Sequence, residues 1–125
     1  MTLFRNYWFP QEERLLQQFT KIVGAASSSE ICLVSSLTVN LHVALSTFYR
    51  PLQSERKKIM IISPEFNSDV FAIKSWLSLY GIDDGLIEVN VEDINMANDN
   101  IIAEIEKSKD EIQVLSFSAV NYVTG

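Results

Sequence analysis

The chain has 125 residues, of which 47% are hydrophobic, and its formal net charge is -6 at pH 7. This composition is typical of one modest globular domain with a real core, and it excludes a disordered chain. The acidic balance also argues against nucleic acid as a partner, because binding to a phosphate backbone usually requires a basic face.

The cysteine count and the length of the apolar runs exclude further classes of protein. Cys32 is the only cysteine, so an intrachain disulfide and a cysteine-based metal cluster are both excluded, and its apolar neighbours favour a buried position. No apolar run approaches membrane-spanning length, and the first eight residues lack the core of a signal peptide. We therefore expect a soluble, cytoplasmic protein with no membrane partner and no metal.

The first predicted element is a helix over 10–24. Pro10 suits a first helical turn because its missing N–H would have no partner there, and Gly24 is a natural C-terminal stop. Five apolar residues at helical spacing form its stripe: Leu15, Leu16, Phe19, Ile22 and Val23. A polar linker follows over 25–30, and the apolar run Ile31–Val34 then predicts a short strand.

The next predicted element is a helix over 37–49 that starts from the polar turn Ser35-Ser36. Five apolar residues recur at helical spacing and indicate its buried face: Leu37, Leu41, Ala44, Leu45 and Phe48. Pro51 ends the helix, because the residue before a proline avoids helical backbone angles. The free amides and the positive dipole end of such a helix suit a phosphate. Simple capping by Ser or Thr explains the same residues, and both interpretations stay open here.

Three strands are predicted in the rest of the chain, near 58–63, 86–91 and 112–117. The first is continuously apolar, which is typical of a strand buried on both faces, and the basic cluster Arg56-Lys57-Lys58 is its solvated start. A helix between the first two strands carries Ile73, Trp76, Leu77 and Tyr80 on one face and ends at Gly81. Asn67 or Ser68 can cap this helix, and Asp69 favours its first turn. A short acidic helix around Ile101, Ile102 and Ile105 precedes the last strand.

The alternation of helices and strands predicts an α/β fold with three αβα layers and a mostly parallel sheet. Ligands in such folds bind outside the carboxyl ends of the strands. Three polar loops follow predicted strands, over 35–38, 66–69 and 118–124. We expect them to converge on one crevice. The sequence stops just past a strand, which favours a part of a larger domain over a small complete one.

Three stretches of the chain together resemble kynureninase, a family of pyridoxal-phosphate-dependent enzymes. They are Ser36–His42 (SLTVNLH), Phe66–Asp69 (FNSD) and Phe117–Gly125 (FSAVNYVTG), and their order and spacing also match. Residues 8–34 match the preceding helix of the family more loosely. The resemblance covers nearly the whole chain but only the early part of the family's large domain. It therefore implies that residues 1–125 are one incomplete large-domain fragment of the fold type I pyridoxal-phosphate enzymes.

The resemblance assigns the cofactor site to seven residues: Leu37, Thr38, Phe66, Asn67, Ser68, Asp69 and Ser118. It implies that Leu37 and Thr38 bind the phosphate of pyridoxal 5'-phosphate through backbone amides and the threonine hydroxyl. It also implies that Phe66 stacks on the pyridine ring, for which a flat apolar side chain is needed. Asn67 replaces a proline that is typical of the family, so the loop is expected to be less rigid.

The resemblance places three further residues without a firm role. Asn121 and Tyr122 fall near the position of the substrate or of the ring hydroxyl of the cofactor. His42 lies one turn after Thr38, where we expect it to pack between helices, and we assign no chemistry to it.

The activity that the resemblance implies is hydrolysis of L-kynurenine or 3-hydroxykynurenine to anthranilate or 3-hydroxyanthranilate and L-alanine, in a homodimer. This chemistry needs a Schiff-base lysine and an acid that keeps the pyridine nitrogen protonated. In the family both groups come after the last residue of this sequence. The lysines present lie in linker or surface patterns: Lys21, Lys57, Lys58, Lys74, Lys107 and Lys109. We therefore assign no catalytic residue and expect the chain alone to be inactive.

Two other hypotheses stay open. The first is another fold type I pyridoxal-phosphate enzyme, such as a cysteine desulfurase or an aminotransferase. Only the stretches 37–42 and 66–69 favour kynureninase over these enzymes. The second is a non-catalytic truncated chain that acts by pairing with an intact subunit. A nucleotide-binding module would need a glycine-rich phosphate loop, and the sequence contains none.

Overall fold

The computed structural model describes residues 9–91 and 97–123, with the side chains of 9–12 and 97 left out. The chain divides into two compact units, Met1–Ser35 and Ser36–Gly125. We call them the N-terminal unit and the sheet unit, and each is described by itself. The expectation of one partial domain over the whole chain stays a prediction.

The N-terminal unit consists of helix α2 (Phe9–Val23) and the short 3-10 helix η1 (Ser28–Glu30). Gly24 follows α2 with a positive φ of 72°, a conformation that glycine adopts without strain, so the predicted stop is confirmed. The prediction of a strand over Ile31–Val34 is wrong, because no strand forms there. A strand needs a neighbour for its backbone hydrogen bonds, and the described part of this unit offers no other strand. Cys32 is exposed for the same reason, contrary to the expected burial.

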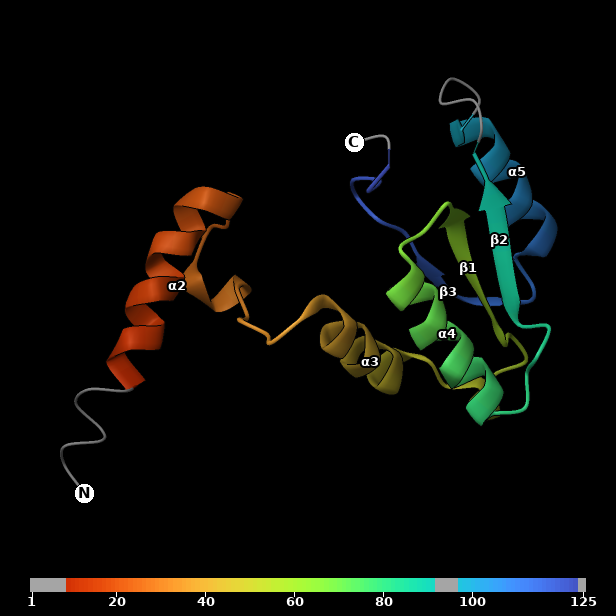
Figure 1. The fold of residues 1–125 in the computed structure, drawn as a ribbon, viewed down its shortest axis with the longest axis horizontal. Helices are drawn as coiled ribbons and strands as arrows, with labels where there is room; N and C mark the ends of the chain where they lie inside the picture. The colour runs from red at the N-terminus through yellow and green to blue at the C-terminus, as the bar shows by residue number, and fades with distance from the viewer. Residues whose placement is uncertain (1–8, 92–96, 124–125) are drawn as a thin grey trace. The chain divides into compact units, whose positions relative to one another are not determined.

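The sheet unit is built on three parallel strands in the order β2-β1-β3 (Figure 1). Their bounds are Lys58–Ser63 for β1, Leu86–Asn90 for β2 and Ile112–Ser116 for β3, which confirms the three predicted strands. In the central strand Met60 is paired with Ile87 on one side and Leu115 on the other. Successive side chains of a strand point to opposite faces, so this strand contributes to two separate cores.

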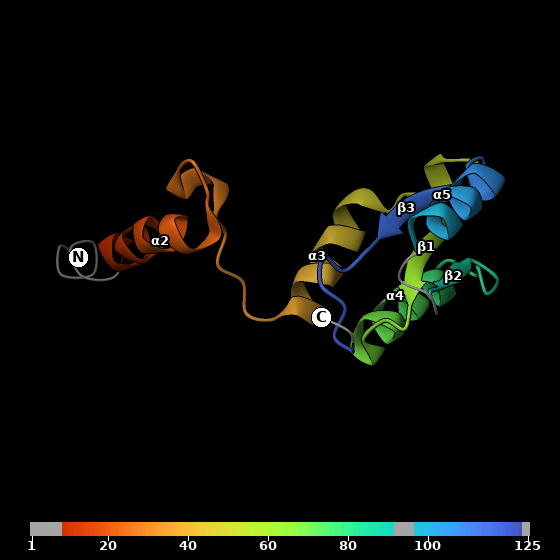
Figure 2. The same cartoon turned by 90° about the horizontal axis from the view of Figure 1, so that it is seen from above.

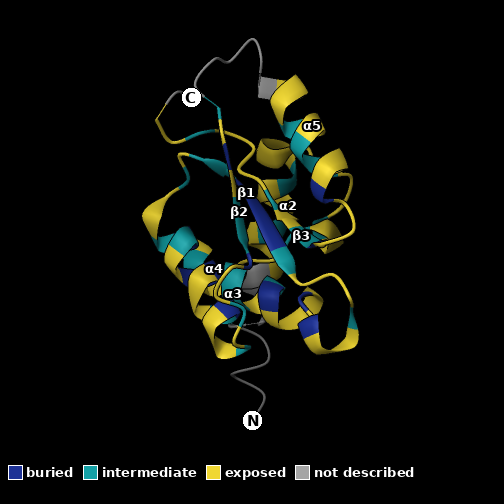
Figure 3. Ribbon diagram, turned by 90° about the vertical axis from the view of Figure 1, so that its right-hand side faces the viewer, coloured by how far each residue is buried: buried dark blue, intermediate teal, exposed yellow. Residues whose placement is uncertain are grey.

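Helices cover both faces of the sheet, as the αβα prediction requires. Helices α3 (Leu37–Phe48) and α4 (Asn67–Leu79) pack on the face that carries Ile59 and Ile61. Helix α5 (Ala97–Ser108) packs on the opposite face, against Met60. Figure 3 shows α4 and α5 on opposite sides of the sheet, with buried residues in β1 between them. The fold is therefore a three-layer α/β arrangement.

The buried face of α3 agrees with the predicted one in part. Leu45 is buried, and Leu41 and Ala44 of the predicted stripe are half-buried, with Leu41 packed against the core of this face. Leu37 and Phe48, at the two ends of the stripe, are 65% and 74% exposed. Thr38 and His42 are half-buried as well, and a count of apolar residues overlooks them. Pro51 begins the short helix η2 (Pro51–Gln53), so α3 ends before it as predicted.

The start of α4 also departs from the prediction. The N-cap is Phe66, which makes no side-chain hydrogen bond to the helix, and Asn67 is already the first helical residue. The expected cap by Asn67 or Ser68 is therefore wrong. Ser68 bonds to Asp69 and Thr38 instead, so its hydroxyl is engaged outside a capping role. Asp69 lies in the first turn as predicted, and Gly81 follows the helix with a φ of 68°.

Candidate functional site

The starts of α3 and α4 are joined by a chain of hydroxyl groups. The Thr38 hydroxyl donates to the Ser68 hydroxyl oxygen at 3.4 Å, and the Ser68 hydroxyl donates to Asp69 Oδ1 at 3.2 Å. Asp69 is 8% exposed, so the chain of hydrogen bonds ends in a nearly buried carboxylate. Two loops that are thirty residues apart in the sequence therefore meet at the carboxyl end of β1, as the convergence of polar loops predicted.

The N-terminus of α3 keeps two amides available. Ser36 is the N-cap, and its hydroxyl accepts from the Val39 N–H at 3.2 Å while its carbonyl accepts from the Asn40 N–H at 3.0 Å. Among the residues that the structure describes, no acceptor is paired with the Leu37 or Thr38 amide. The capping and phosphate interpretations are therefore compatible, because the cap uses a later amide. Two free amides at the positive end of a helix dipole can bind an anion.

The segment after β3 is the third part of the site. The Ser118 hydroxyl lies 2.9 Å from Oε1 and 2.8 Å from Oε2 of Glu65, to which it donates. Asn121 Nδ2 donates to the Pro64 carbonyl at 3.0 Å, so the segment is tied to the loop before α4 at a second point. Figures 1 and 2 show this segment returning from β3 toward the start of α4. Thr124, the last residue of the predicted loop, lies outside the described residues.

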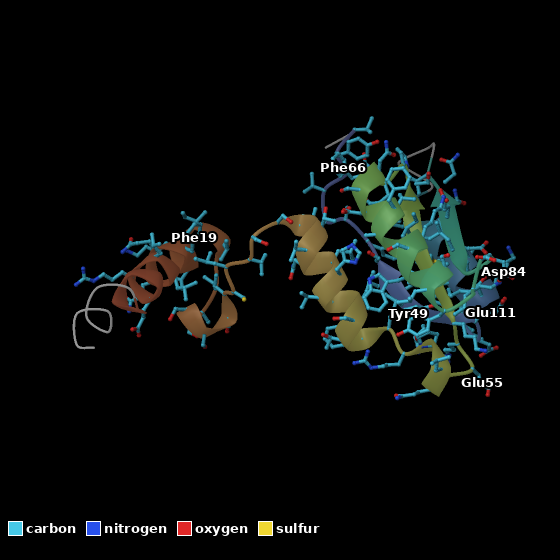
Figure 4. All side chains as sticks on the ribbon, turned by 60° about the horizontal axis from the view of Figure 1, so that its bottom comes forward. Phe19, Tyr49, Glu55, Phe66, Asp84 and Glu111 are labelled. Carbon is cyan, nitrogen blue, oxygen red and sulfur yellow. The ribbon has the colours of Figure 1, made fainter. Side chains whose placement is uncertain are left out.

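Phe66 is the aromatic residue of the site. Phe66 is 49% exposed, and its ring and that of Tyr122 form a T-shaped pair with a centroid distance of 5.5 Å and an interplanar angle of 79°. Figure 4 shows Phe66 at the opposite end of the sheet unit from Asp84 and Glu111. The exposed part of the ring is available to a flat ligand, since aromatic rings stack in offset or edge-on arrangements. Asn67, next to it, is exposed.

The lysines of the sheet unit lie away from this end. Lys58 forms an ion pair with Glu111 at 2.6 Å, and this hydrogen bond raises the pKa of the lysine above its ordinary value. Three other ion pairs join Lys74 to Glu88, Lys107 to Glu104 and Lys109 to Glu106. No hydrogen bond or ion pair of the described part of the chain links a lysine to a predicted site residue. The same part contains no cluster of three or more metal-ligating side chains.

Sequence reasoning missed Glu65 and the partner of His42. Glu65 lies between Pro64 and Phe66 in a loop, where neither periodicity nor a motif indicates that it binds Ser118. His42 is half-buried as expected, and its Nδ1 accepts a hydrogen bond from Trp76 Nε1 at 2.8 Å across the α3–α4 contact. The sequence predicted that Trp76 lies on the apolar face of α4, but it did not predict that the indole N–H donates to His42.

The fold defines part of a parallel α/β domain, with the candidate site at the edge where such domains bind ligands. The comparison with known proteins is more specific. The chain is 35% identical to a kynureninase of Koribacter versatilis, over 97% of this chain and 29% of that protein. It is 34% identical to the kynureninases of Homo sapiens and Yarrowia lipolytica over 94% of its length. No protein-family model matches the chain.

The similarity extends over nearly the whole chain, and the chain is therefore kynureninase-like. This confirms the resemblance and the assignment to part of a fold type I domain. The chain spans less than a third of the length of the curated relatives it matches. In its described part, no helix is long and apolar enough to cross a lipid bilayer.

Proposed function

We propose that this chain is a part of a kynureninase and supplies one wall of its pyridoxal 5'-phosphate site. The proposal is supported by the hydroxyl chain that joins Thr38 to Ser68 and Asp69 beside two available amides. These are residues that the resemblance assigns to the cofactor. The intact protein would be a cytoplasmic homodimer that hydrolyses L-kynurenine or 3-hydroxykynurenine to L-alanine and the matching anthranilate.

The residues present fit the phosphate and the ring of this cofactor. The Leu37 and Thr38 amides would bind phosphate oxygens, and Thr38 would add its hydroxyl. Phe66 would cover one face of the pyridine ring, because nearly half of its side chain is exposed. Ser68, Asp69 and Ser118 would line the site, next to Asn67. When bound, the cofactor supplies an electron sink for cleavage of the substrate.

The chain alone is expected to lack hydrolase activity. A pyridoxal-phosphate enzyme needs a lysine that bonds to the cofactor, and no described lysine bonds to a site residue. Incubation of the purified chain with pyridoxal phosphate and kynurenine should release no anthranilate above a control that contains the cofactor alone. Release above that control would show that a lysine of this chain suffices. Absence of activity also agrees with the second candidate, a non-catalytic chain that pairs with an intact subunit.

Binding of the phosphate tests the proposal directly. We expect Thr38→Ala to weaken binding of pyridoxine 5'-phosphate roughly ten- to a hundredfold, the effect of one hydrogen bond to a charged group. This analogue keeps the ring and the phosphate but has no aldehyde, so surface lysines do not react with it. Thr47→Ala is the matched control, because Thr47 lies in the same helix and donates only to the Val43 carbonyl. Equal affinity of the wild-type chain and Thr38→Ala by calorimetry would contradict the phosphate role.

A further inference from the structure

Glu65 contacts the candidate site, although the proposed function assigns no cofactor contact to it. Its carboxylate accepts the Ser118 hydroxyl at 2.8 and 2.9 Å, and Oε1 also accepts the Phe66 N–H at 2.8 Å. Glu65 therefore touches two of the residues that are expected to line the cofactor site. Its side chain is half-buried, whereas Ser118 is exposed.

The contact fixes the hydrogen-bonding character of Ser118. A serine hydroxyl has one proton to donate and two lone pairs that accept. Because the carboxylate is acceptor-only when ionised, the proton of Ser118 must point to Glu65. The Ser118 oxygen is then left as an acceptor, which suits a hydrogen-bond donor on a ligand and not a phosphate oxygen.

We propose that Glu65 is a positioning residue of the cofactor site, which holds Ser118 so that its oxygen accepts a hydrogen bond from a donor group of the pyridine ring. This inference rests on the proposed function. Ser118 would thus recognise the ring, by way of its hydroxyl group or its nitrogen-bound proton, while the start of α3 recognises the phosphate. The Asn121–Pro64 hydrogen bond and the Phe66–Tyr122 ring contact hold the same segment in place.

The negative charge of Glu65 makes a two-ligand comparison necessary. A carboxylate close to an anion site weakens binding of any anion, so its removal alone strengthens binding of every phosphate compound. Inorganic phosphate reports this charge effect, because it has no ring for Ser118 to contact. Pyridoxine 5'-phosphate reports the charge effect together with the ring contact. The ratio of the two affinities isolates the positioning role.

We expect Glu65→Ala to lower the ratio of pyridoxine 5'-phosphate affinity to inorganic phosphate affinity roughly fivefold, the size of one hydrogen bond. Ser118→Ala should lower it by a similar factor, and the double variant should lose no more than either single variant. Glu65→Gln keeps one acceptor oxygen and should restore part of the ratio. An unchanged ratio in Glu65→Ala, or losses that add in the double variant, would overturn the proposal.

A measurement without ligand separates this inference from the proposed function. In the apo chain, the chemical shift of the Phe66 amide should move in Glu65→Ala, since that amide donates to Glu65. The resonances of Ser118 should move as well, because the hydroxyl loses its acceptor. If these shifts occur but neither ligand binds the wild-type chain, the cofactor assignment fails although the contact exists. If Ser118 does not respond, the positioning role fails independently of the cofactor.

Discussion

The two faces of the sheet are covered unequally. On the face of α3 and α4, six residues are buried into one cluster: Leu45, Tyr49, Ile59, Ile61, Ile73 and Leu77. On the face of α5, the buried cluster contains three of the residues that the structure describes, Met60, Val89 and Ile112. The helices of the larger cluster are also the ones whose first turns form the candidate site. The candidate site therefore lies on the helices of the layer with the larger buried cluster, whereas α5 packs on the face with the smaller one.

The largest test of this comparison removes one isoleucine from each face. Ile73→Ala empties a position with 0% exposure in the larger cluster and should cost about 3 kcal/mol of unfolding free energy. Ile105→Ala removes a half-buried side chain from the α5 face and should cost about 1 kcal/mol. Urea unfolding followed by circular dichroism measures both. Equal losses would show that the two faces stabilise the sheet unit to the same degree.

A second test concerns Tyr49, which belongs to the larger cluster. Tyr49 has 0% exposure, its ring meets Tyr80 edge-on, and its hydroxyl donates to the Lys57 carbonyl at 2.7 Å. Burial, followed by the charge of Tyr80, raises the pKa of Tyr49 from 10.0 to about 12. The folded state therefore favours the neutral phenol. Its contribution to stability is complete below pH 10 and is lost as the pH rises toward 12.

The measurement is the unfolding free energy across this alkaline range, together with the absorbance of tyrosinate. Tyr49→Phe should remove the part of the pH dependence that belongs to Tyr49, and at neutral pH it should cost about 1 kcal/mol for the lost hydrogen bond. A wild-type chain whose stability does not change between pH 10 and pH 12 would contradict the buried environment of Tyr49.

A smaller effect on stability is expected at the start of α3, where the helix cap lies next to the amides of the candidate site. Ser36→Ala removes the cap that accepts the Val39 N–H and should cost about 1 kcal/mol. Ser36→Asp keeps a capping oxygen, so stability should be retained, but its negative charge should weaken binding of pyridoxine 5'-phosphate. Thermal unfolding and calorimetry check the two variants. If Ser36→Asp binds the ligand as well as the wild-type chain, the phosphate does not lie at this helix end.

The sequence predicted most of the sheet unit because strands and helices there follow the hydrophobic pattern. The run at 58–63 is apolar on both faces, and the structure buries Ile59, Met60 and Ile61 on both faces. The pattern failed where burial depends on a distant partner. Ile31–Val34 has the composition of a strand, but no strand lies beside it among the described residues of its unit.

The candidate site could be predicted only in part. The meeting of the loops followed from the topology, since parallel strands end at one edge of a sheet. The contact of Glu65 with Ser118 did not follow, because these residues are 53 positions apart and neither belongs to a periodic pattern. Part of the buried face of α3 was missed in the same way, because the half-buried Thr38 and His42 make hydrogen bonds to Ser68 and Trp76. Hydropathy does not report such pairs.

The smallest effect is expected from the ion pair at the amino end of the strands, which belongs to neither core. The Lys58 side chain is 26% exposed and that of Glu111 is 54% exposed, so water screens their attraction. Because the hydrogen bond to Glu111 raises the pKa of Lys58, the pair stabilises the fold below the ordinary pKa of lysine and is lost above it. Lys58→Gln should therefore lower the urea midpoint less than Ser36→Ala does, and added salt should reduce the difference from wild type. If Lys58→Gln lowered the unfolding free energy at neutral pH as much as Ile73→Ala does, this ion pair would stabilise the sheet unit as strongly as a residue of the larger cluster.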